Sequence, residues 1–280
     1  MNPSCPFPHA FQRPRWRLAA LALTFALAGC AGPRPASPEA IAALLASPDR
    51  SAADRVNDQR RKPAELLAFI GARPGMVALD VSAARGYTTE LIARAVGASG
   101  KVYGQNAPRD PARQPPAQPE GAAAPPMPAP AAAPAPVTLA DRARNPATAH
   151  IVPVTRPFED PAPPEVADGK LDLVTLMFNY HDLGHLRVDR ARLNQAVFKA
   201  LKPGGMYVIA DHSGRPGTGI SEAGTLHRIE EAFLRREVEA AGFRLAASAD
   251  FLRNPRDPRD RNTPEPPMPK DEFVLKFVKP

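Results

Sequence analysis

The side chains best suited to chemistry in this sequence are polar groups that directly follow two apolar segments. They are Asn179, Tyr180, His181 and Asp182 after the first segment, and Asp211 and His212 at the end of the second. Histidine titrates near neutral pH, so it can accept or donate a proton, and a neighbouring carboxylate can orient its ring. We expect His181 to act as a general base oriented by Asp182, with His212 as the second candidate. Asn179 or Tyr180 would hold the substrate.

The same residues and their neighbours also offer enough nitrogen and oxygen ligands for a metal ion. The possible ligands are His181, Asp182, His185, Asp211, His212 and His227. No HExxH motif occurs among them, so the sequence favours proton transfer without a metal. Each histidine could also do no more than cap a helix or hydrogen-bond to a loop carbonyl. No GxSxG elbow or P-loop occurs, so a hydrolase or a nucleoside triphosphatase has no support.

The opening unit of a parallel sheet is predicted in the first third of the chain. An apolar run from Met76 to Leu79 ends at Asp80, and a loop of small residues follows from Ser82 to Gly86. Glu90 to Val96 then has helical spacing, and a short strand begins at Lys101. This is a βαβ unit, and its loop abuts a helix N-terminus, where unpaired N–H groups and the helix dipole favour ligand binding.

Further strands and helices are predicted along the rest of the chain. Strands are expected at His150–Val154, Leu171–Phe178, Met206–Ala210, Phe243–Leu252 and Phe273–Val278. Helices are expected at Ile41–Leu45, Asp54–Lys62, from Pro63 onward, and at Asp189–Leu201 and Thr225–Ala241, and a turn at Lys202–Gly205. In open α/β sheets ligands lie beyond the carboxyl ends of the strands, so the polar groups that follow the strands should face one pocket.

These segments resemble class I S-adenosylmethionine-dependent methyltransferases. The resemblance rests on the segment from Asp80 to Gly86 and on RKPAELLAFIGARPGM, LDLVTLMFNYHDL, LNQAVFKALKPGGMYVIADHSG, TLHRIEEAFLRREVEAAGF and DEFVLKFVKP. Within that class, the chain is similar to a group of exported bacterial predicted methyltransferases that carry a YHD tripeptide. The resemblance implies an α/β fold over residues 51–280, namely a Rossmann-like, doubly wound sheet of seven mostly parallel strands with a C-terminal antiparallel strand.

The resemblance also implies S-adenosylmethionine as the cofactor and a set of residues that bind it. These are Asp80, Ser82, Ala84, Gly86 and Tyr87 in and after the first loop, Gln105 and Asn106 at the ribose hydroxyls, and Glu159 and Asp160 near the adenine. Methyl transfer to oxygen or nitrogen requires that the acceptor lose a proton, which is the task expected of His181. The charged segment Asp54–Lys62 is expected to be a solvated helix, which could also cover the cofactor pocket.

Two functions remain open at this point. One is an active methyltransferase that acts on a small molecule or an envelope component. The other is a catalytically silent lipoprotein that keeps the methyltransferase fold as a binding or scaffold module. Ser82 and Ala84 stand where the family has glycines, and they allow a close ligand approach only if their φ is negative. Gln105 and Asn106 lack the charge of the usual ribose-binding acid. The retained Asp80 and the YHD tripeptide favour the enzyme.

The N-terminal segment predicts export. A basic stretch from Arg13 to Arg17 precedes an apolar run, Leu18 to Ala28, that is too short for a stable membrane span, so residues 1–29 indicate a signal peptide. The sequence ending in Cys30 matches the bacterial lipoprotein box, which implies lipidation of Cys30 and a periplasm-facing membrane anchor. Ala31 after the cysteine favours the outer membrane. A simple signal peptide with an incidental cysteine is the alternative. Residues 30–50 would form a tether and a short helix.

Composition limits the remaining possibilities. The only cysteines are Cys5 and Cys30, which excludes a disulfide, a thiolate zinc site and a cysteine nucleophile from the folded part. The formal net charge of +7 falls to +4 without the three signal-peptide arginines, so charge does not argue for nucleic acid, and we expect a small-molecule substrate. The chain has 36 prolines, and residues 107–149 are so rich in proline and alanine that we expect a disordered insertion within the domain.

Overall fold

The computed structural model describes Met1 and residues 35–108, 137–262, 264 and 268–280. From residue 35 onward, the described residues belong to one compact unit. The predicted signal peptide, the lipoprotein box with Cys30 and the central part of the Pro/Ala-rich insertion lie outside the described residues. Within the described part of the chain, every helix is too short or too polar to cross a membrane.

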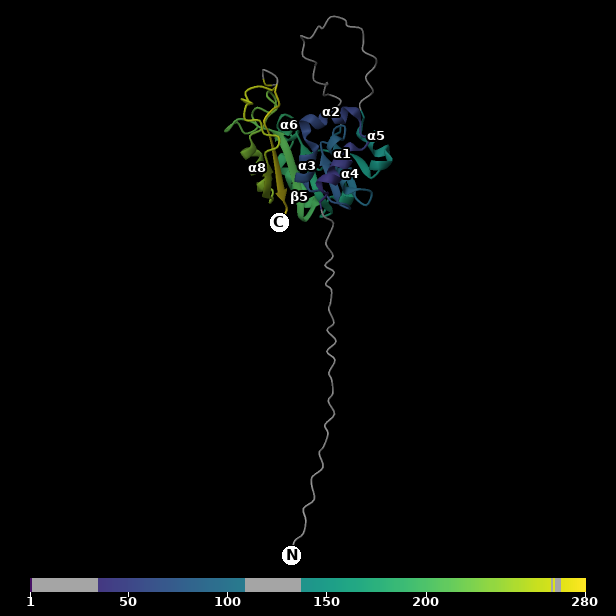
Figure 1. Cartoon of the computed structure of the whole chain (residues 1–280). Coiled ribbons are helices and arrows are strands. Elements are labelled where there is room, and N and C mark those ends of the chain that lie inside the picture. The colour runs from purple at the N-terminus through teal and green to yellow at the C-terminus, as the bar shows by residue number, and fades with distance from the viewer. Residues whose placement is uncertain (2–34, 109–136, 263, 265–267) are drawn as a thin grey trace, which may run out of the picture. The chain divides into compact units, whose positions relative to one another are not determined.

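A seven-stranded sheet forms the centre of the fold (Figure 1). Its strands are β1 (Val77–Val81), β2 (Lys101–Asn106), β3 (Ile151–Thr155), β4 (Leu171–Met177), β5 (Leu201–His212), β6 (Arg244–Ala249) and β7 (Glu272–Val278). Their order is β3-β2-β1-β4-β5-β7-β6; β1 to β5 pair in parallel, and β7 lies antiparallel between β5 and β6. The predicted fold class is therefore confirmed. The strand order reverses between β1 and β4, and such a switch point opens a crevice beyond the carboxyl ends of the strands.

Helices cover both faces of the sheet. They are α1 (Pro38–Ala46), α2 (Ala52–Arg61), α3 (Pro63–Ile70), α4 (Tyr87–Val96), α5 (Leu139–Arg144), α6 (Tyr180–His185), α7 (Arg190–Ala200) and α8 (Glu231–Ala240), with 3₁₀ turns η1 (Pro146–Thr148) and η2 (Pro164–Val166). Helices α1, α3 and α4 share a core cluster with Ala78, whereas α7 and α8 share another with Leu79. Successive strand residues point to opposite faces, so both faces of β1 are buried, as the apolar strand sequences predict.

Helix α2 differs from the others because it packs through charged groups. Its buried residue is Asp54, and Ser51 caps its N-terminus by accepting a hydrogen bond from the Asp54 N–H. At its other end Arg60 pairs with Glu272, and Arg61 stacks on the ring of Phe178, 3.6 Å from the ring centroid. The predicted charged helix is therefore present, and it lies over the carboxyl ends of β4 and β5.

The predicted disordered insertion is too long at its C-terminal end. Residues 137–149 contain α5 and η1, and α5 begins with a capping box between Thr138 and Asp141. Leu139 and Arg142 are buried, and Arg142 donates to both carboxylate oxygens of Asp54 at 2.7 and 2.9 Å and pairs with Glu90. A helix that is held by an ion pair need not show a periodic pattern of apolar residues. The prediction of disorder for this segment therefore rested on the neighbouring prolines.

The predicted helix Thr225–Ala241 is wrong in its first six residues, because α8 begins at Glu231. The preceding residues form a loop in which Ile229 makes a parallel β-bridge with Ser213, at the end of β5. Arg228 anchors this loop, since its side chain is fully buried and donates to both carboxylate oxygens of Asp257 at 2.8 and 3.2 Å. Tertiary contacts thus override a helical pattern of apolar residues.

The expected turn at Lys202–Gly205 is an irregularity within β5. Leu171 of β4 pairs with Leu201, and Leu173 pairs with Met206. Between these two pairs β5 therefore has four residues, whereas β4 has one. Gly204 has a φ of 74°, a conformation that glycine adopts without strain. The two glycines therefore serve backbone geometry, as predicted.

Candidate active site

The loop after β1 follows a left-handed path at three positions. The φ angles are 58° at Ser82, 50° at Ala84 and 84° at Gly86. The sequence analysis allowed a close ligand approach at Ser82 and Ala84 only if their φ were negative, and the structure does not meet this condition, because both residues adopt a positive φ. Each such residue costs about 1 kcal/mol or more, so neighbouring contacts must hold the loop in place.

Two amide side chains at the end of β2 supply those contacts. Gln105 Oε1 accepts a hydrogen bond from the Ser82 N–H at 3.0 Å, and Asn106 Oδ1 accepts one from the Ala84 N–H at 2.8 Å. The Gln105 amide also donates to the Arg156 carbonyl at 2.6 Å and is fully buried. Gln105 and Asn106, predicted to contact ribose hydroxyls, are therefore used to brace the loop, and neither lines the cavity beside it.

Asp80, at the carboxyl end of β1, is almost completely buried. Its two oxygens accept hydrogen bonds from the Thr89 hydroxyl at 2.6 Å and the Thr175 hydroxyl at 2.7 Å. Burial raises the pKa of Asp80 to about 6, although both threonine hydrogen bonds act in the opposite direction. Asp80 is thus fixed at the switch point between β1 and β4, and it stands at the end of the first strand as the sequence predicted.

A cavity of about 290 Å³ lies beside this loop. Its wall consists of Asn57, Arg61, Asp80, Ser82, Ala83, Ala84, Arg85, Tyr87, Thr88 and Met177. We refer to it as the loop cavity, and its volume lies just below the roughly 300–1,000 Å³ range of small-molecule sites. Arg85 and Tyr87 form part of the wall without filling the cavity, and Tyr87 donates its hydroxyl to Asp58 at 2.8 Å. Asn57 and Arg61 belong to α2, so this helix covers part of the cavity.

Among the residues of the loop cavity that the sequence analysis did not predict as site residues, Arg61 is of most chemical interest. Its Nη1 atom is buried and has no hydrogen-bond partner among the described residues. Burial, together with the nearby Arg60, lowers the pKa of Arg61 to about 10, so the guanidinium still carries its charge at neutral pH. A buried cationic donor without a partner is costly, and an anionic ligand group in the cavity would satisfy it.

The polar groups after β4 and β5 come together in a cluster, but none of them lines the loop cavity, so the single pocket that the sequence predicted is not seen. Asp211 Oδ1 lies 2.6 Å from His181 Nδ1, and Asp211 Oδ2 accepts from the His181 backbone N–H at 2.7 Å. Asp182 Oδ1 lies 3.2 Å from His181 Nε2 and 2.9 Å from His227 Nδ1. We call Asn179, His181, Asp182, Asp211 and His227 the strand-end cluster.

Asn179 connects this cluster to the loop after β1. Its side-chain oxygen accepts a hydrogen bond from the Ser82 hydroxyl at 2.6 Å, and its Nδ2 donates to Asp182 Oδ2 at 2.9 Å. The serine in the family's glycine position therefore makes a contact that glycine could not make. A chain of hydrogen bonds runs from the predicted cofactor loop to the predicted proton-transfer residues.

The electrostatics of His181 do not fit a resting general base. Burial disfavours its charged form, but the neighbouring Asp211 and Asp182 outweigh this effect and raise the pKa of His181 to about 9. At neutral pH both ring nitrogens then carry protons, which are directed at carboxylates. In this arrangement His181 would have to lose one of these protons before it could act as the predicted base, and that role stays a prediction.

His212, the second predicted base, has the opposite character. Burial lowers the pKa of His212 to about 3, even though the Asp211 charge acts in the opposite direction. Its Nδ1 lies 2.9 Å from Glu272 Oε1, outside hydrogen-bonding geometry, and burial raises the pKa of Glu272 to about 7. Its ring lies 5.3 Å from that of His181 and 5.7 Å from that of Phe178, so it packs against the cluster.

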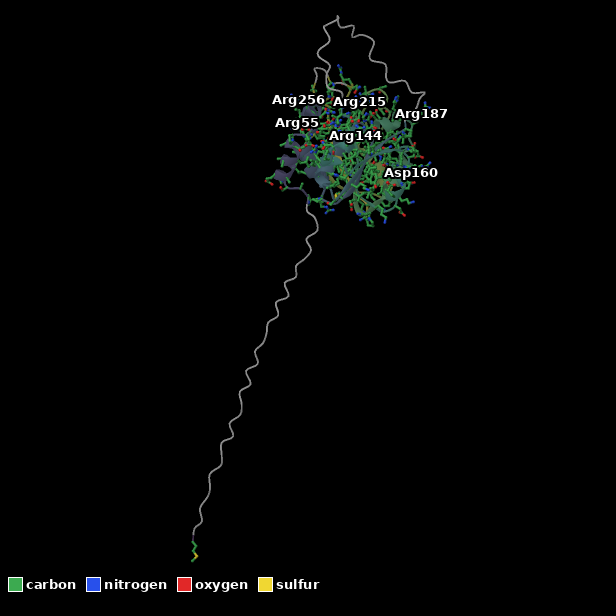
Figure 2. The ribbon with its side chains drawn as sticks, turned by 90° about the vertical axis from the view of Figure 1, so that its right-hand side faces the viewer. Arg55, Arg144, Asp160, Arg187, Arg215 and Arg256 are labelled. Carbon is green, nitrogen blue, oxygen red and sulfur yellow. The ribbon has the colours of Figure 1, made fainter. Side chains whose placement is uncertain are left out.

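Three other predicted site residues lie away from the loop cavity. Tyr180, expected to hold substrate, is fully buried, donates to Glu237 at 3.0 Å and accepts from Asn194 at 2.8 Å, so it supports the core. Glu159 accepts a hydrogen bond from the Asp189 N–H, and Asp160, labelled in Figure 2, pairs with Arg156. Neither acidic residue lines the cavity at which adenine contact was expected.

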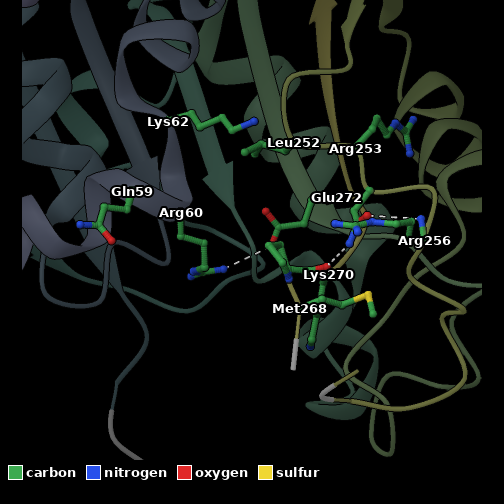
Figure 3. Close-up of a pocket in the computed structure, with 11 residues that line it drawn as sticks. Gln59, Arg60, Lys62, Leu252, Arg253, Arg256, Met268, Lys270 and Glu272 are labelled. Carbon is green, nitrogen blue, oxygen red and sulfur yellow. Dashed lines mark hydrogen bonds and ion pairs between the residues drawn. The ribbon is translucent and has the colours of Figure 1, made fainter. Parts of the chain in front are cut away.

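A second and larger cavity, of about 640 Å³, lies between α2 and the segments that flank β7 (Figure 3). It is lined by Gln59, Arg60, Lys62, Leu252, Arg253, Asn254, Arg256, Met268, Pro269, Lys270 and Glu272. Five of these side chains are basic and one is acidic, so we call it the basic cavity. Arg60 faces this cavity and Arg61 the loop cavity, and both lie over Phe178. The sequence analysis did not predict the basic cavity, because the residues of its wall come from three separate segments of the chain.

Comparisons with known proteins bear on the fold. No protein-family model and no curated protein matches this chain. Among solved structures, the chain is similar to a SAM-dependent methyltransferase from Aquifex aeolicus, with 17% identity, a TM-score of 0.52, and coverage of 88% of this chain and 100% of the other.

Two further structures agree with this likeness. An arsenic(III) S-adenosylmethionine methyltransferase from Chlamydomonas reinhardtii has 17% identity and a TM-score of 0.51, covering 87% of this chain and 74% of the other. A putative methyltransferase from Bacillus halodurans has 14% identity and a TM-score of 0.51, covering 78% and 98%. The fold is thus the class I methyltransferase fold, and at these identities the likeness concerns the fold alone.

Proposed function

We propose that this protein is an S-adenosylmethionine-dependent methyltransferase whose acceptor is a small molecule with an acidic group. The observation that carries the proposal is the loop cavity, where the buried Asp80 and Arg61, whose Nη1 has no hydrogen-bond partner among the described residues, lie beside a left-handed loop. The methionine part of the cofactor carries a carboxylate and an ammonium group. Arg61 would bind the carboxylate and Asp80 the ammonium group, so the charges of the wall suit the ligand.

The cofactor, when bound, supplies an electrophilic methyl group, and the residues of this chain would place the acceptor against it. The basic cavity is the proposed acceptor site because Arg60 in its wall and Arg61 in the wall of the loop cavity both lie over the ring of Phe178. Its excess of arginine and lysine favours a carboxylate or phosphate on the acceptor, and Leu252 and Met268 provide apolar contact. Orientation of two bound reactants is the main contribution of such a site.

A silent binding module is the second candidate. It is favoured by the amides that occupy the ribose-binding position, because Gln105 is fully committed to the loop and to Arg156. Calorimetric titration of the purified protein with S-adenosylmethionine and S-adenosylhomocysteine separates the two candidates. We expect saturable heat with both ligands and a rise in melting temperature. No heat and no thermal shift in folded protein would support the silent module instead.

We also propose that the protein is exported as a lipoprotein, which rests on the basic, apolar and small-residue order before Cys30. Mass spectrometry of the membrane fraction should find an N-terminal diacylglyceryl cysteine at Cys30. A Cys30→Ser variant should lose the lipid and leave the membrane fraction. Recovery of an unprocessed chain that begins at Met1 would contradict the proposal.

A further inference from the structure

We propose that His181, Asp182 and His227 form a binding site for one divalent first-row transition-metal ion such as Zn²⁺. One ligand atom from each of the three side chains lies within 4.8 Å of the others. Asp182 Oδ1 lies 3.2 Å from His181 Nε2 and 2.9 Å from His227 Nδ1. Ligands in neighbouring positions on one ion, with bonds of about 2.1 Å, are separated by about 3.0 Å in an octahedron and about 3.4 Å in a tetrahedron.

Two of the proposed ligands are oriented by partners that do not themselves face the site. Asp211 is fully buried and accepts a hydrogen bond from Nδ1 of His181. This contact directs the other ring nitrogen, Nε2, toward Asp182. Asn179 donates to Asp182 Oδ2, which leaves Oδ1 on the side of the two histidines. Histidine ligands of metals generally have such a carboxylate on their other ring nitrogen, and ligating carboxylates are hydrogen-bonded in the same way.

The third ligand comes from a segment that the fold holds in place at some cost. His227 has a φ of 51°, in the left-handed region. The next two residues fix it, because Arg228 is buried against Asp257 and Ile229 bridges to Ser213. Strained positions held by their surroundings are concentrated at functional sites. The same loop replaced the helix that the sequence pattern predicted, so the chain departs from its local preference where His227 is presented.

The donor set indicates the class of metal. Two imidazoles and one carboxylate suit zinc, iron, cobalt, nickel or manganese, whereas magnesium and calcium prefer oxygen ligands alone. Three protein ligands leave coordination positions for solvent or a substrate atom, as in catalytic sites. The side chains of His227 and Asp182 are 41% and 27% exposed, so an ion can enter from solvent. Binding at His181 Nε2 requires the neutral ring, so the proton at this nitrogen is released to solvent.

The inference can be tested by Co²⁺ titration of the untagged, metal-depleted full chain, followed by absorbance, with Zn²⁺ as the competitor. We expect one displaceable ion per folded chain. His227→Ala should weaken binding at least 100-fold, and Asp211→Asn should weaken it about 10- to 100-fold. His185→Ala is the matched control, because His185 is exposed at the end of α6 and outside the ligand set, and it should bind as the wild type does.

Thermal unfolding of each protein with and without metal supplies a second readout. Metal should raise the melting temperature of the wild type and of His185→Ala, but not that of His227→Ala. Absence of binding to folded wild-type protein, or equal affinity in the wild type and His227→Ala, would overturn the inference. Titration of the metal-depleted protein with S-adenosylmethionine is independent of this result, so failure of the proposed function and failure of the metal site can be distinguished.

Discussion

At the scale of single residues, the central feature is a buried guanidinium nitrogen that has no hydrogen-bond partner among the described residues. Arg61 stacks on Phe178 and lines the loop cavity, and its Nη1 is the nitrogen in question. Its neighbour Arg60 is satisfied by Glu272. The difference between these two adjacent arginines indicates that Arg61 is kept for a ligand, and the carboxylate of the methionine moiety is the proposed partner.

This assignment predicts a loss of cofactor affinity in Arg61→Ala. Hydrogen bonds to a charged group contribute about 1.5–3 kcal/mol, so the dissociation constant for S-adenosylhomocysteine should rise by roughly 10- to 150-fold. Calorimetric titration would measure the change. Arg192→Ala, which removes an exposed arginine of α7, is the control and should bind as the wild type does. Equal affinities in the two variants would exclude Arg61 from the cofactor site.

A second residue-scale prediction concerns Glu272 and pH. Its pKa is raised from 4.5 to about 7 by burial, so the folded state holds this proton more strongly than the unfolded state. The corresponding stability is fully present below pH 4.5 and is lost as the pH rises through 7, by about 3 kcal/mol at most.

Urea unfolding of Glu272→Gln across this pH range provides the test. The variant keeps a neutral side chain at every pH, so its stability should lack the decrease attributed to Glu272 and should exceed that of the wild type at pH 8. Glu239→Gln, at a partly exposed position of α8, should follow the wild-type profile. If the stability of the wild type and that of Glu272→Gln depended on pH in the same way, the raised pKa assigned to Glu272 would be contradicted.

Residue identity alone could predict some of the site and not the rest. Asp80, His181, Asp182 and Asn179 were found because they follow apolar strands, and strand ends meet at one edge of the sheet. The roles of Gln105 and Tyr180 were wrong because hydrogen-bond partners far along the chain, Arg156 and Glu237, decide which way each side chain points. No local pattern in the sequence records such pairings.

At the scale of elements, α5 shows how a short helix can be held by charge. Its Arg142 forms ion pairs with Asp54 of α2 and Glu90 of α4, so three helices converge on one buried guanidinium. Gly86 packs against the same side chain, since an added Cβ there would lie 2.7 Å from Leu139 and 3.0 Å from Arg142. Gly86 therefore serves helix packing as well as a positive φ.

Removal of this guanidinium should destabilise the protein strongly. Arg142→Met would leave the carboxylates of Asp54 and Glu90 buried without their cation, at a cost of about 3–5 kcal/mol. Arg144→Met changes an exposed arginine of the same helix (Figure 2) and should cost less than about 0.5 kcal/mol. Denaturant unfolding would measure both. Similar stabilities of the two variants would show that α5 does not depend on the buried cluster.

Element prediction succeeded where burial is periodic and failed where it is not. The boundaries of β1, α7 and β7 follow from apolar runs and capping residues, for example Asp189, which accepts from the Arg192 N–H at the start of α7. The start of α8 and the existence of α5 depend instead on the buried ion pairs of Arg228 and Arg142. The two arginines resemble surface residues in the sequence, and only the fold shows that both are buried.

At the scale of the whole molecule, the fold brings two cavities to one edge of the sheet. The loop cavity belongs to β1 and its loop, whereas the basic cavity is built by α2 and the segments before β7. The sequence predicted the doubly wound sheet and a ligand site at the loop after the first strand, which is sufficient to place the first cavity. The second depends on the packing of the irregular segment between β6 and β7, for which composition predicts only a loop.

The charge of the basic cavity predicts selectivity for amphipathic anions. We expect 8-anilinonaphthalene-1-sulfonate to bind the folded protein, with its aromatic part against Leu252 and Met268 and its sulfonate toward Lys270 and Arg256. Lys270→Ala should weaken dye binding about 5- to 10-fold, which corresponds to about 1–1.4 kcal/mol for one charged contact. Affinity for S-adenosylhomocysteine should not change. Fluorescence titration measures the first and calorimetry the second, and a dye affinity independent of Lys270 would contradict the acceptor site.

The account as a whole depends on occupancy of the loop cavity by an adenosyl ligand. The most direct measurement is a crystal structure of the protein grown with a saturating concentration of S-adenosylhomocysteine. We expect electron density for the ligand beside the loop Ser82–Gly86, with its amino-acid carboxylate on Arg61 and its ammonium group on Asp80. A well-ordered structure with solvent in this cavity at that concentration would contradict the proposed methyl transfer.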